Sequence, residues 1–299
     1  MVKLAKIIMS TFLVLVLGVI ISSPAHAAYK IGVLAKRGAD KAMAKWGPTG
    51  AYLTKKMGTE VTIVPLKFVE IEPAIKAKEI DFLLANSSFY AVIHKKYGAR
   101  ALLTLMNERQ GLSLHQFGGV LFSRKGSGIT SVNQMKGKRF MCVKYSSFGG
   151  AQMAWRLLLK NKIDPYTDLA DFTEGKTHDK VVLAVLKGDT DVGTVRTDTL
   201  ERMQAEGIIK LSDFNIINKI SDTFPFVHST ILYPEWPIAA LPHINKADAK
   251  KVAKTLMLMS TDNPAIKTAK IIGWTYAADY KPVAECLQEI GYGPFAKAE

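Results

Sequence analysis

The strongest constraint on the fold is an alternation of two kinds of segment along the chain. Short apolar runs rich in β-branched residues predict buried strands, and between them lie segments whose apolar residues recur at helical spacing. Such a βαβαβ series indicates a mostly parallel sheet with helices on its faces. We therefore predict an α/β fold.

The series occurs twice. In the first part of the chain we predict strands at 29–35, 60–68, 81–88, 99–107 and 117–126, with helices at 40–58, 70–80 and 87–98. In the second part we predict helices at 131–137, 149–164, 177–188 and 199–207, with strands at 138–145, 171–175, 190–197 and 215–220. Three prolines exclude a long helix from 228–242, and two further helices are predicted at 247–260 and 263–274.

The N-terminal segment and the length of the chain predict how it is divided into a signal peptide and two lobes. Lys3 and Lys6 precede an apolar run of about 15 residues, and Ala25-His26-Ala27 has the small-x-small pattern of a cleavage site, so residues 1–27 are predicted to be a secretory signal peptide. The alternative, a membrane anchor, needs roughly 20 apolar residues. The remaining chain exceeds the usual size of one core. We predict two lobes, one formed by 28–120 plus 228–299 and the other by 121–227, in a periplasmic protein.

The chain is strongly basic. Its formal net charge is +14, and removal of the signal peptide lowers it to +12, since that segment holds two lysines and no acidic residue. This charge favours an anionic ligand, an anionic membrane face or an acidic partner, although a solvated lysine-rich surface accounts for most of it equally well. No basic run is interleaved with aromatic residues, so nucleic acid is not an expected partner.

Polar residues follow several predicted strands where a helix begins. In α/β sheets ligands bind at the carboxyl ends of the strands, where helix N-termini offer unpaired N–H donors to anions. The candidate ligand-binding residues in such places are Ser87, Ser88 and Tyr90, then Arg37, then Ser146, Ser147, Phe148, Gly149 and Gly150, then Thr177 and His178. Each serine or threonine in these places could also be an ordinary helix N-cap. An anion site is therefore favoured only by the occurrence of several such residues together.

Two kinds of residue add to this expectation. Gly149 and Gly150 cost helix stability, which is easier to understand if the backbone approaches a ligand. Arg196, like Arg37, follows a strand and could pair with an oxyanion; the alternatives are a surface arginine or, for Arg196, a salt bridge with Asp198.

The chain has no recognisable catalytic motif. P-loop, zinc-protease, nucleophile-elbow and paired-cysteine patterns are absent, and the histidines lack metal-ligand spacing. We expect no enzyme activity, no metal and no cofactor. Cys142 and Cys286 lie in a predicted strand and a predicted helix, and either a disulfide or two free thiols is compatible with the sequence.

Four longer segments resemble a known family. The segments KYSSFGGAQMAWRLLLKNKIDP, THDKVVLAVLKGDTDVGTVRTDTLERM, HSTILYPEWPIAALP and GWTYAADYKPV are similar to those of phosphate/phosphite/phosphonate-type periplasmic substrate-binding proteins. Within that family the chain resembles the periplasmic sensor modules of tetrathionate-type sensor histidine kinases. The resemblance implies a type II periplasmic binding protein, with two α/β lobes, a hinge and a ligand cleft between the lobes.

The resemblance also implies a site. Its anion-holding Ser-Thr-Ser-Gly turn corresponds to residues 145–150 here, where Phe148 replaces a small polar residue and indicates an oxyanion other than phosphonate or a partly apolar organic anion. Ser87, Ser88 and Tyr90 match the first-lobe site, and Thr177, His178 and Arg196 match the second-lobe site.

We therefore expect a monomeric solute-binding protein that delivers a small anion, such as a phosphorus or sulfur oxyanion, to an ABC transporter permease. The alternative is a free-standing sensor that presents its ligand to a membrane histidine kinase, because the sequence ends without a kinase domain. Residues 232–237 (LYPEWP) form either a docking surface for that partner or a packed hinge crossover.

Overall fold

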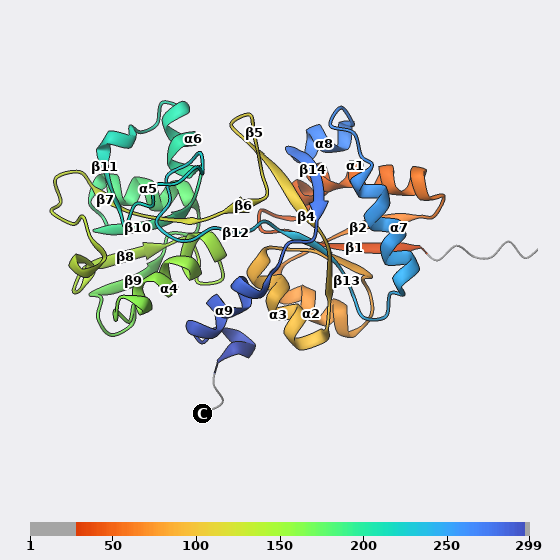
Figure 1. Ribbon diagram of the computed structural model, residues 1–299, viewed down its shortest axis with the longest axis horizontal. Helices are drawn as coiled ribbons and strands as arrows, with labels where there is room; N and C mark the ends of the chain where they lie inside the picture. Colours follow the sequence, from red (N-terminus) through yellow and green to blue (C-terminus); the bar gives the residue numbers. More distant parts are fainter. Residues whose placement is uncertain (1–27, 297–299) are drawn as a thin grey trace, which may run out of the picture.

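The computed structural model describes residues 28–296, and the predicted signal peptide lies outside them. The chain folds into two α/β lobes that lie side by side (Figure 1). The larger sheet, in lobe 1, contains β14 (Ile271–Tyr276), β4 (Arg100–Arg109), β13 (Pro237–Ala240), β3 (Phe82–Leu84), β1 (Tyr29–Leu34) and β2 (Val61–Leu66) in this order, with β5 (Leu112–Leu114) paired to β4.

Helices cover both faces of this sheet. The core of one face is formed with α1 (Ala39–Met57), α7 (Lys246–Met257) and α8 (Pro264–Ala269). The core of the other face is formed with α2 (Phe68–Lys76), α3 (Ser87–Tyr97) and α9 (Lys281–Glu289). The predicted ends of α1 and α3 are confirmed, since Gly58 and Gly98 adopt the left-handed conformation.

Two expectations for lobe 1 are only partly correct. The sheet is parallel across β2, β1 and β3, but β13 runs antiparallel to β3 and β4, and β14 runs antiparallel to β4. The helix predicted at 263–274 ends at Ala269. Lys270 is left-handed, and Ile271 and Trp274 are buried in β14 beside β4, where β-branched and aromatic side chains pack well.

Lobe 2 has a five-stranded sheet. Its strands are, in pairing order, β11 (Phe214–Ile217), β7 (Gly119–Arg124), β10 (Val192–Arg196), β8 (Arg139–Cys142) and β9 (Asp171–Glu174). Its helices are α4 (Met153–Lys160), α5 (His178–Lys187) and α6 (Thr199–Ala205), with a π-helical turn at Phe148–Gln152 and 3-10 turns at Val132–Met135 and Leu211–Asp213. The core on one face includes Leu158 of α4, and the core on the other includes Val182 of α5 and Met203 of α6.

The lobes are joined by two short antiparallel strands, β6 (Gln116–Phe117) and β12 (Tyr233–Pro234), which run between the two lobes in Figure 1. Tyr233, Pro234 and Glu235 are buried here, so residues 232–237 are a packed crossover and not an exposed docking surface. Helix α9 also touches both lobes, packing on α3 and on α4.

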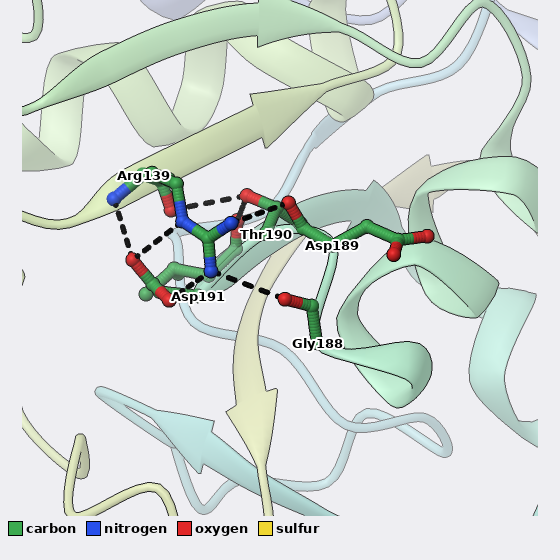
Figure 2. A network of polar contacts seen from close by, with 6 residues as sticks. Arg139, Gly188, Asp189, Thr190 and Asp191 are labelled. Carbon is green, nitrogen blue, oxygen red and sulfur yellow. Dashed lines mark hydrogen bonds and ion pairs between the residues drawn. The ribbon is translucent and has the colours of Figure 1, made fainter.

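One basic residue of lobe 2 illustrates a purely structural role. Arg139 begins β8 and donates to the carbonyl oxygens of Gly188 (3.1 Å) and Asp189 (2.9 Å) and to the Asp191 carboxylate (2.7 Å) (Figure 2). Its charge is thus balanced by a carboxylate and its donors are used to hold the turn before β10.

Within residues 28–296 no helix is long and apolar enough to cross a membrane. Cys142 and Cys286 are buried free thiols, and burial raises the pKa of each to about 12.

Candidate functional site

A cavity of about 210 Å³ opens between the lobes at the carboxyl end of β1. It has room for several water molecules, and therefore for a small ligand. Its lining residues are Leu34, Ala35, Lys36, Arg37, Gly38, Lys41, Ala42, Lys45, Trp46, Leu105, Asn107, Arg109, Arg196 and Trp236. The charged members are all basic.

Lys36 and Arg37 form the turn between β1 and α1. Gly38 follows with φ 98°, a backbone conformation that glycine adopts without strain, and it stands at the N-cap of α1 without any side-chain capping bond. The N-terminus of α1 thus faces the cavity, and its dipole and free N–H groups favour an anion there. The fold therefore places two cations and a helix terminus on the same side of the cavity.

Two tryptophans form apolar walls. The Lys36 ammonium group lies 4.9 Å from the centre of the Trp236 ring, and the Lys45 ammonium group lies 5.0 Å from the centre of the Trp46 ring. Such contacts keep each ammonium group beside the cavity without neutralising its charge.

Arg196 enters the cavity from lobe 2, at the end of β10. Its Nη2 donates to Glu235 Oε1 at 2.7 Å, its Nε lies 3.4 Å from Asp198 Oδ1, and its guanidinium stacks 4.5 Å above the Phe117 ring. Burial alone would raise the pKa of the Glu235 carboxyl, but the positive charges of Arg196 and Arg109 hold it below its ordinary value. Of the two alternatives for Arg196, the salt bridge with Asp198 is therefore present, together with a stronger one to Glu235.

Arg109 reaches the cavity from the far end of β4. This strand continues into a tight hairpin with β5, in which Gln110 and Gly111 both have positive φ. Arg109 Nε lies 3.4 Å from Asp198 Oδ2 of lobe 2. The hairpin thus brings a lobe 1 arginine to a lobe 2 carboxylate.

Around the cavity, positive charges outnumber negative ones. Among the ion pairs of residues 28–296, none involves the lining residues Lys36, Arg37, Lys41 and Lys45. Desolvation of the ammonium groups by the cavity walls, and then repulsion by neighbouring cations, lower the pKa of Lys36 to about 7 and that of Lys45 to about 8. Lys36 remains exposed to water in the cavity, so the neighbouring charges are partly screened. The cavity retains a surplus of positive charge.

His178 stands at the first position of α5 and accepts a hydrogen bond from the backbone N–H of Arg196 at 3.3 Å through Nδ1. Burial, and then the charges of Lys36 and Arg196, lower its pKa well below the ordinary value, so its imidazole is neutral. Thr177 caps α5 by accepting from the Lys180 N–H at 3.3 Å. His178 is thus oriented beside the cationic cavity.

The predicted residues of the first-lobe site have structural contacts. The Ser87 hydroxyl donates to the Pro234 carbonyl oxygen at 2.6 Å, and the Tyr90 hydroxyl accepts from the Ala101 N–H at 3.0 Å. Ser87, Ser88 and Tyr90 are all buried, and the cavity lining does not include them. Their role in ligand binding stays a prediction.

The predicted residues 146–150 lie in and before the π-helical turn that precedes α4. Ser146 and Ser147 are half-buried, and Ser147 makes no capping hydrogen bond, so its hydroxyl is not committed to the helix. Phe148 is only 2% exposed and packs edge-on against Phe117 and Tyr233 of the crossover, with ring centres 6.1 and 4.8 Å apart. Phe148 therefore has a clear packing role between the lobes.

Packing also explains the two glycines. A Cβ atom on Gly149 would lie 2.8 Å from the Phe117 ring and 3.1 Å from Arg196 Cβ. A Cβ atom on Gly150 would lie 2.6 Å from Val143. These contacts alone require glycine at both positions, so a nearby ligand is not needed to explain them.

Arg37 and Arg196 are the only members of the predicted set that line the cavity in the described part of the chain. Sequence reasoning singled out the turn 36–38 after this strand but named only Arg37 there as a ligand, although Lys36 adjoins it. It also missed Lys45 and Trp46, for which the helical spacing of Lys41 and Lys45 was the available signal. No local signal indicates Arg109 or Trp236, because only the fold brings them here.

Comparisons with known proteins agree with this architecture. A family model described as the periplasmic substrate-binding protein of phosphonate ABC transporters matches residues 31–282. A tetrathionate sensor histidine kinase from Salmonella typhimurium is 26% identical over 268 residues, which are 89% of this chain and 44% of that protein. The chain thus spans less than half the length of this relative.

Solved structures share the fold. A Xanthomonas citri protein bound to ATP superposes with a TM-score of 0.72 at 18% identity, covering 88% of this chain and 98% of that one. PhnD1 from Prochlorococcus marinus in complex with methylphosphonate gives 0.64 at 13% identity, with the same coverage. A binding-protein component of a phosphonate transporter from Pseudomonas aeruginosa gives 0.64 at 14% identity, covering 89% and 87%. At these identities the likeness concerns the type II periplasmic binding protein fold.

Proposed function

This chain belongs to the family of periplasmic substrate-binding proteins of phosphonate ABC transporters, and on that premise we propose that it captures a small anion in the cavity between its lobes. The family consists of substrate-binding proteins and not of enzymes. The observation that carries the proposal is the surplus of cations around the cavity: Lys36, Arg37, Lys41 and Lys45 line it without an ion-pair partner among residues 28–296.

Anion binding offsets an electrostatic cost of the empty cavity. Gathering four cations around one cavity costs free energy, since they repel one another and the half-buried Lys45 loses part of its hydration. An anion that enters the cavity relieves this repulsion and accepts charge-assisted hydrogen bonds, each stabilising by about 1.5–3 kcal/mol. Binding thus recovers a cost that the empty protein bears.

The remaining predicted residues enter as part of this proposal. Closure of lobe 2 would add Ser146, Ser147 and the amides of Phe148, Gly149 and Gly150, with Thr177 and His178, to the ligand. Ser87, Ser88 and Tyr90 would support the site from lobe 1. We propose the lobe boundaries 28–120 plus 228–299 and 121–227, and a signal peptide at 1–27 that directs the chain to the periplasm.

We propose that the bound anion is delivered to an ABC transporter permease by a monomer. The likeness to a tetrathionate sensor histidine kinase favours a second candidate, in which the protein presents its ligand to a membrane kinase. The two are distinguished by reconstitution: ligand-dependent stimulation of a transporter's ATPase supports delivery, and ligand-dependent stimulation of autophosphorylation of a kinase supports sensing.

Calorimetric titration of residues 28–299 tests anion capture. The panel is sulfate, phosphate, methylphosphonate, tetrathionate, succinate and chloride. We expect at least one to bind with a Kd below 100 μM, and the double variant Lys36→Gln/Arg37→Gln to weaken binding by at least 100-fold.

The matched control is the double variant Lys55→Gln/Lys56→Gln, which removes two positive charges from the last turn of α1 at exposed positions outside the cavity. It should leave the affinity within about twofold. Absence of binding by every anion, or equal loss in the control, would contradict the proposal.

A further inference from the structure

The outer side of α7 carries a stripe of lysines. Lys246, Lys250 and Lys254 are exposed and follow one another at intervals of four residues, which places them on one side of the helix. The opposite side, which includes Val252 and Leu256, is buried in the core of lobe 1. The packing of α7 therefore turns its lysines toward the solvent.

Two further lysines extend this surface. Helix α1 packs on α7, and the Lys251 ammonium group donates to the carbonyl oxygen of Met57, the last residue of α1, at 3.1 Å. Lys55 and Lys56 belong to that same last turn of α1 and are exposed. The surface formed by the two helices is called the lysine face below, and its members are Lys55, Lys56, Lys246, Lys250 and Lys254.

No carboxylate neutralises the lysine face. None of its members takes part in an ion pair in the part of the chain that the structure describes. Asp248, the acidic residue of α7, is half-buried and accepts from Asn245 Nδ2 at 2.8 Å at the start of the helix. The exposed charged residues of the adjoining segments are Glu60, Asp262, Lys267 and Lys270. Since these two acidic and two basic residues balance each other, the positive surplus remains.

Repulsion within the stripe has a cost. Like charges four residues apart destabilise a helix, and Lys246, Lys250 and Lys254 form two such pairs. A negatively charged surface placed against α7 relieves this repulsion.

The stripe ends in apolar side chains. Leu258 continues the four-residue interval of the lysines and is 69% exposed, and its neighbour Met257 is 37% exposed. Lysines next to exposed aliphatic side chains are typical of a helix that lies on a membrane, with the ammonium groups among the lipid headgroups and the aliphatic groups at the acyl boundary.

The composition favours a lipid surface over a protein partner. Neither α7 nor the last turn of α1 (54–57) contains an arginine or an aromatic residue. Protein interfaces are enriched in arginine and aromatic residues and depleted of lysine, whereas anionic headgroups attract lysine without any fixed geometry.

We propose that the lysine face and Leu258 bind the surface of a membrane that contains anionic phospholipids. Helix α7 lies on the side of lobe 1 remote from lobe 2 (Figure 1). Helix α1 has its N-terminus at the cavity and its C-terminus at the lysine face, and its 19 residues span roughly 28 Å. A protein held on a membrane by this face therefore keeps its cavity accessible.

Cosedimentation of residues 28–299 with lipid vesicles tests the proposal. The vesicles consist of phosphatidylcholine alone or of phosphatidylcholine mixed with phosphatidylglycerol. We expect binding to the mixed vesicles only, and loss of that binding when added salt shortens the Debye length from about 10 Å to about 3 Å. Each lysine near an anionic surface contributes about fivefold to the affinity. The triple variant Lys246→Gln/Lys250→Gln/Lys254→Gln should therefore weaken binding by about 100-fold.

The matched control removes the same charge from lobe 2. Its substitutions are Lys125→Gln, Lys136→Gln and Lys138→Gln, at exposed positions without an ion pair among the described residues. This variant should bind the mixed vesicles within about threefold of the parent. Leu258→Gln should weaken binding by about fivefold and leave the urea-unfolding midpoint unchanged, because this side chain is mostly exposed in the free protein.

Three outcomes would overturn the proposal. They are absence of binding to the mixed vesicles, equal binding to neutral vesicles, and an equal loss in the lobe 2 variant. Soluble poly-glutamate that binds as tightly as the mixed vesicles, with no effect of Leu258→Gln, would assign the face to an acidic protein partner instead. Both triple variants should keep the parent's urea-unfolding midpoint and its affinity for the captured anion, so this test stands apart from that of the proposed function.

Discussion

The ion pair between Glu235 and Arg196 allows a quantitative test of the charge arrangement, through the variant Glu235→Gln. The side chains of Glu235 and Arg196 are 0% and 14% exposed, and their atoms are 2.7 Å apart. Removing one partner of a buried pair costs about 3–5 kcal/mol, because the other charge stays buried. A Coulomb energy of about 4 kcal/mol at 4 Å and an effective dielectric constant of 20 has the same size.

Asp198 remains near Arg196 in the variant and offsets part of the loss. We therefore expect the free energy of unfolding to fall by about 3 kcal/mol, measured by urea unfolding followed by tryptophan fluorescence. Anion affinity should change in the opposite direction. The variant cavity carries one more uncompensated positive charge, so we expect the Kd for the tightest anion to fall by about tenfold, equivalent to about 1.4 kcal/mol.

The control is Glu206→Gln, which removes a partly exposed carboxylate paired with Arg202 in lobe 2. An exposed pair contributes about 0–1 kcal/mol, so this variant should unfold almost as the parent does. If Glu235→Gln loses less than 1 kcal/mol, or if it binds the anion more weakly than the parent, the argument that Glu235 neutralises Arg196 is refuted.

Three further outcomes follow from the contacts. Phe148→Ala should lower the free energy of unfolding by about 3–4 kcal/mol in urea titrations, since a buried aromatic ring between the lobes is lost. The Arg156 guanidinium holds the pKa of Glu289 below its usual range. The stability that this α4–α9 pair contributes is therefore complete above the unfolded pKa of about 4.3 and is lost as the pH falls through the lower pKa of the folded state. Glu289→Gln should reduce the pH dependence of the urea-unfolding midpoint between pH 5 and 3. Cys142 and Cys286 should react with a thiol reagent at pH 8 only after unfolding, because burial raises both pKa values to about 12.

The parts of the fold that were predictable are those set by local sequence. The strand at 29–35 is predicted by its hydrophobic pattern, and the end of the helix at Gly58 is predicted by a glycine that can adopt the left-handed conformation. Both signals lie within a few residues of sequence. The β14 strand was missed because Ile271 and Trp274 extend a helical pattern in sequence, and only pairing with β4 makes them a strand.

The site was less predictable, for a physical reason. A serine before a helix looks the same whether it holds a ligand or caps the helix, and Ser87 is already bonded to the Pro234 carbonyl. What distinguishes a ligand cation from a structural one is whether a carboxylate neutralises it, and that carboxylate can be distant in sequence. Arg196 pairs with Glu235, which is 39 residues away in the sequence, whereas Lys36 pairs with no carboxylate within residues 28–296.

The distribution of these charges bears on how the protein closes. The lining cations without an ion pair, Lys36, Arg37, Lys41 and Lys45, all belong to lobe 1, so on the proposed function an anion can be neutralised by lobe 1 alone. The lobes are held together by pairs that do not involve the ligand: Arg196 with Glu235 of the crossover, and Arg109 with Asp198. Closure in this arrangement does not need the ligand as a bridging counter-charge. If the proposed function holds, the ligand relieves repulsion within lobe 1, and we expect affinity to depend more on the charge of the ligand than on its fit against lobe 2.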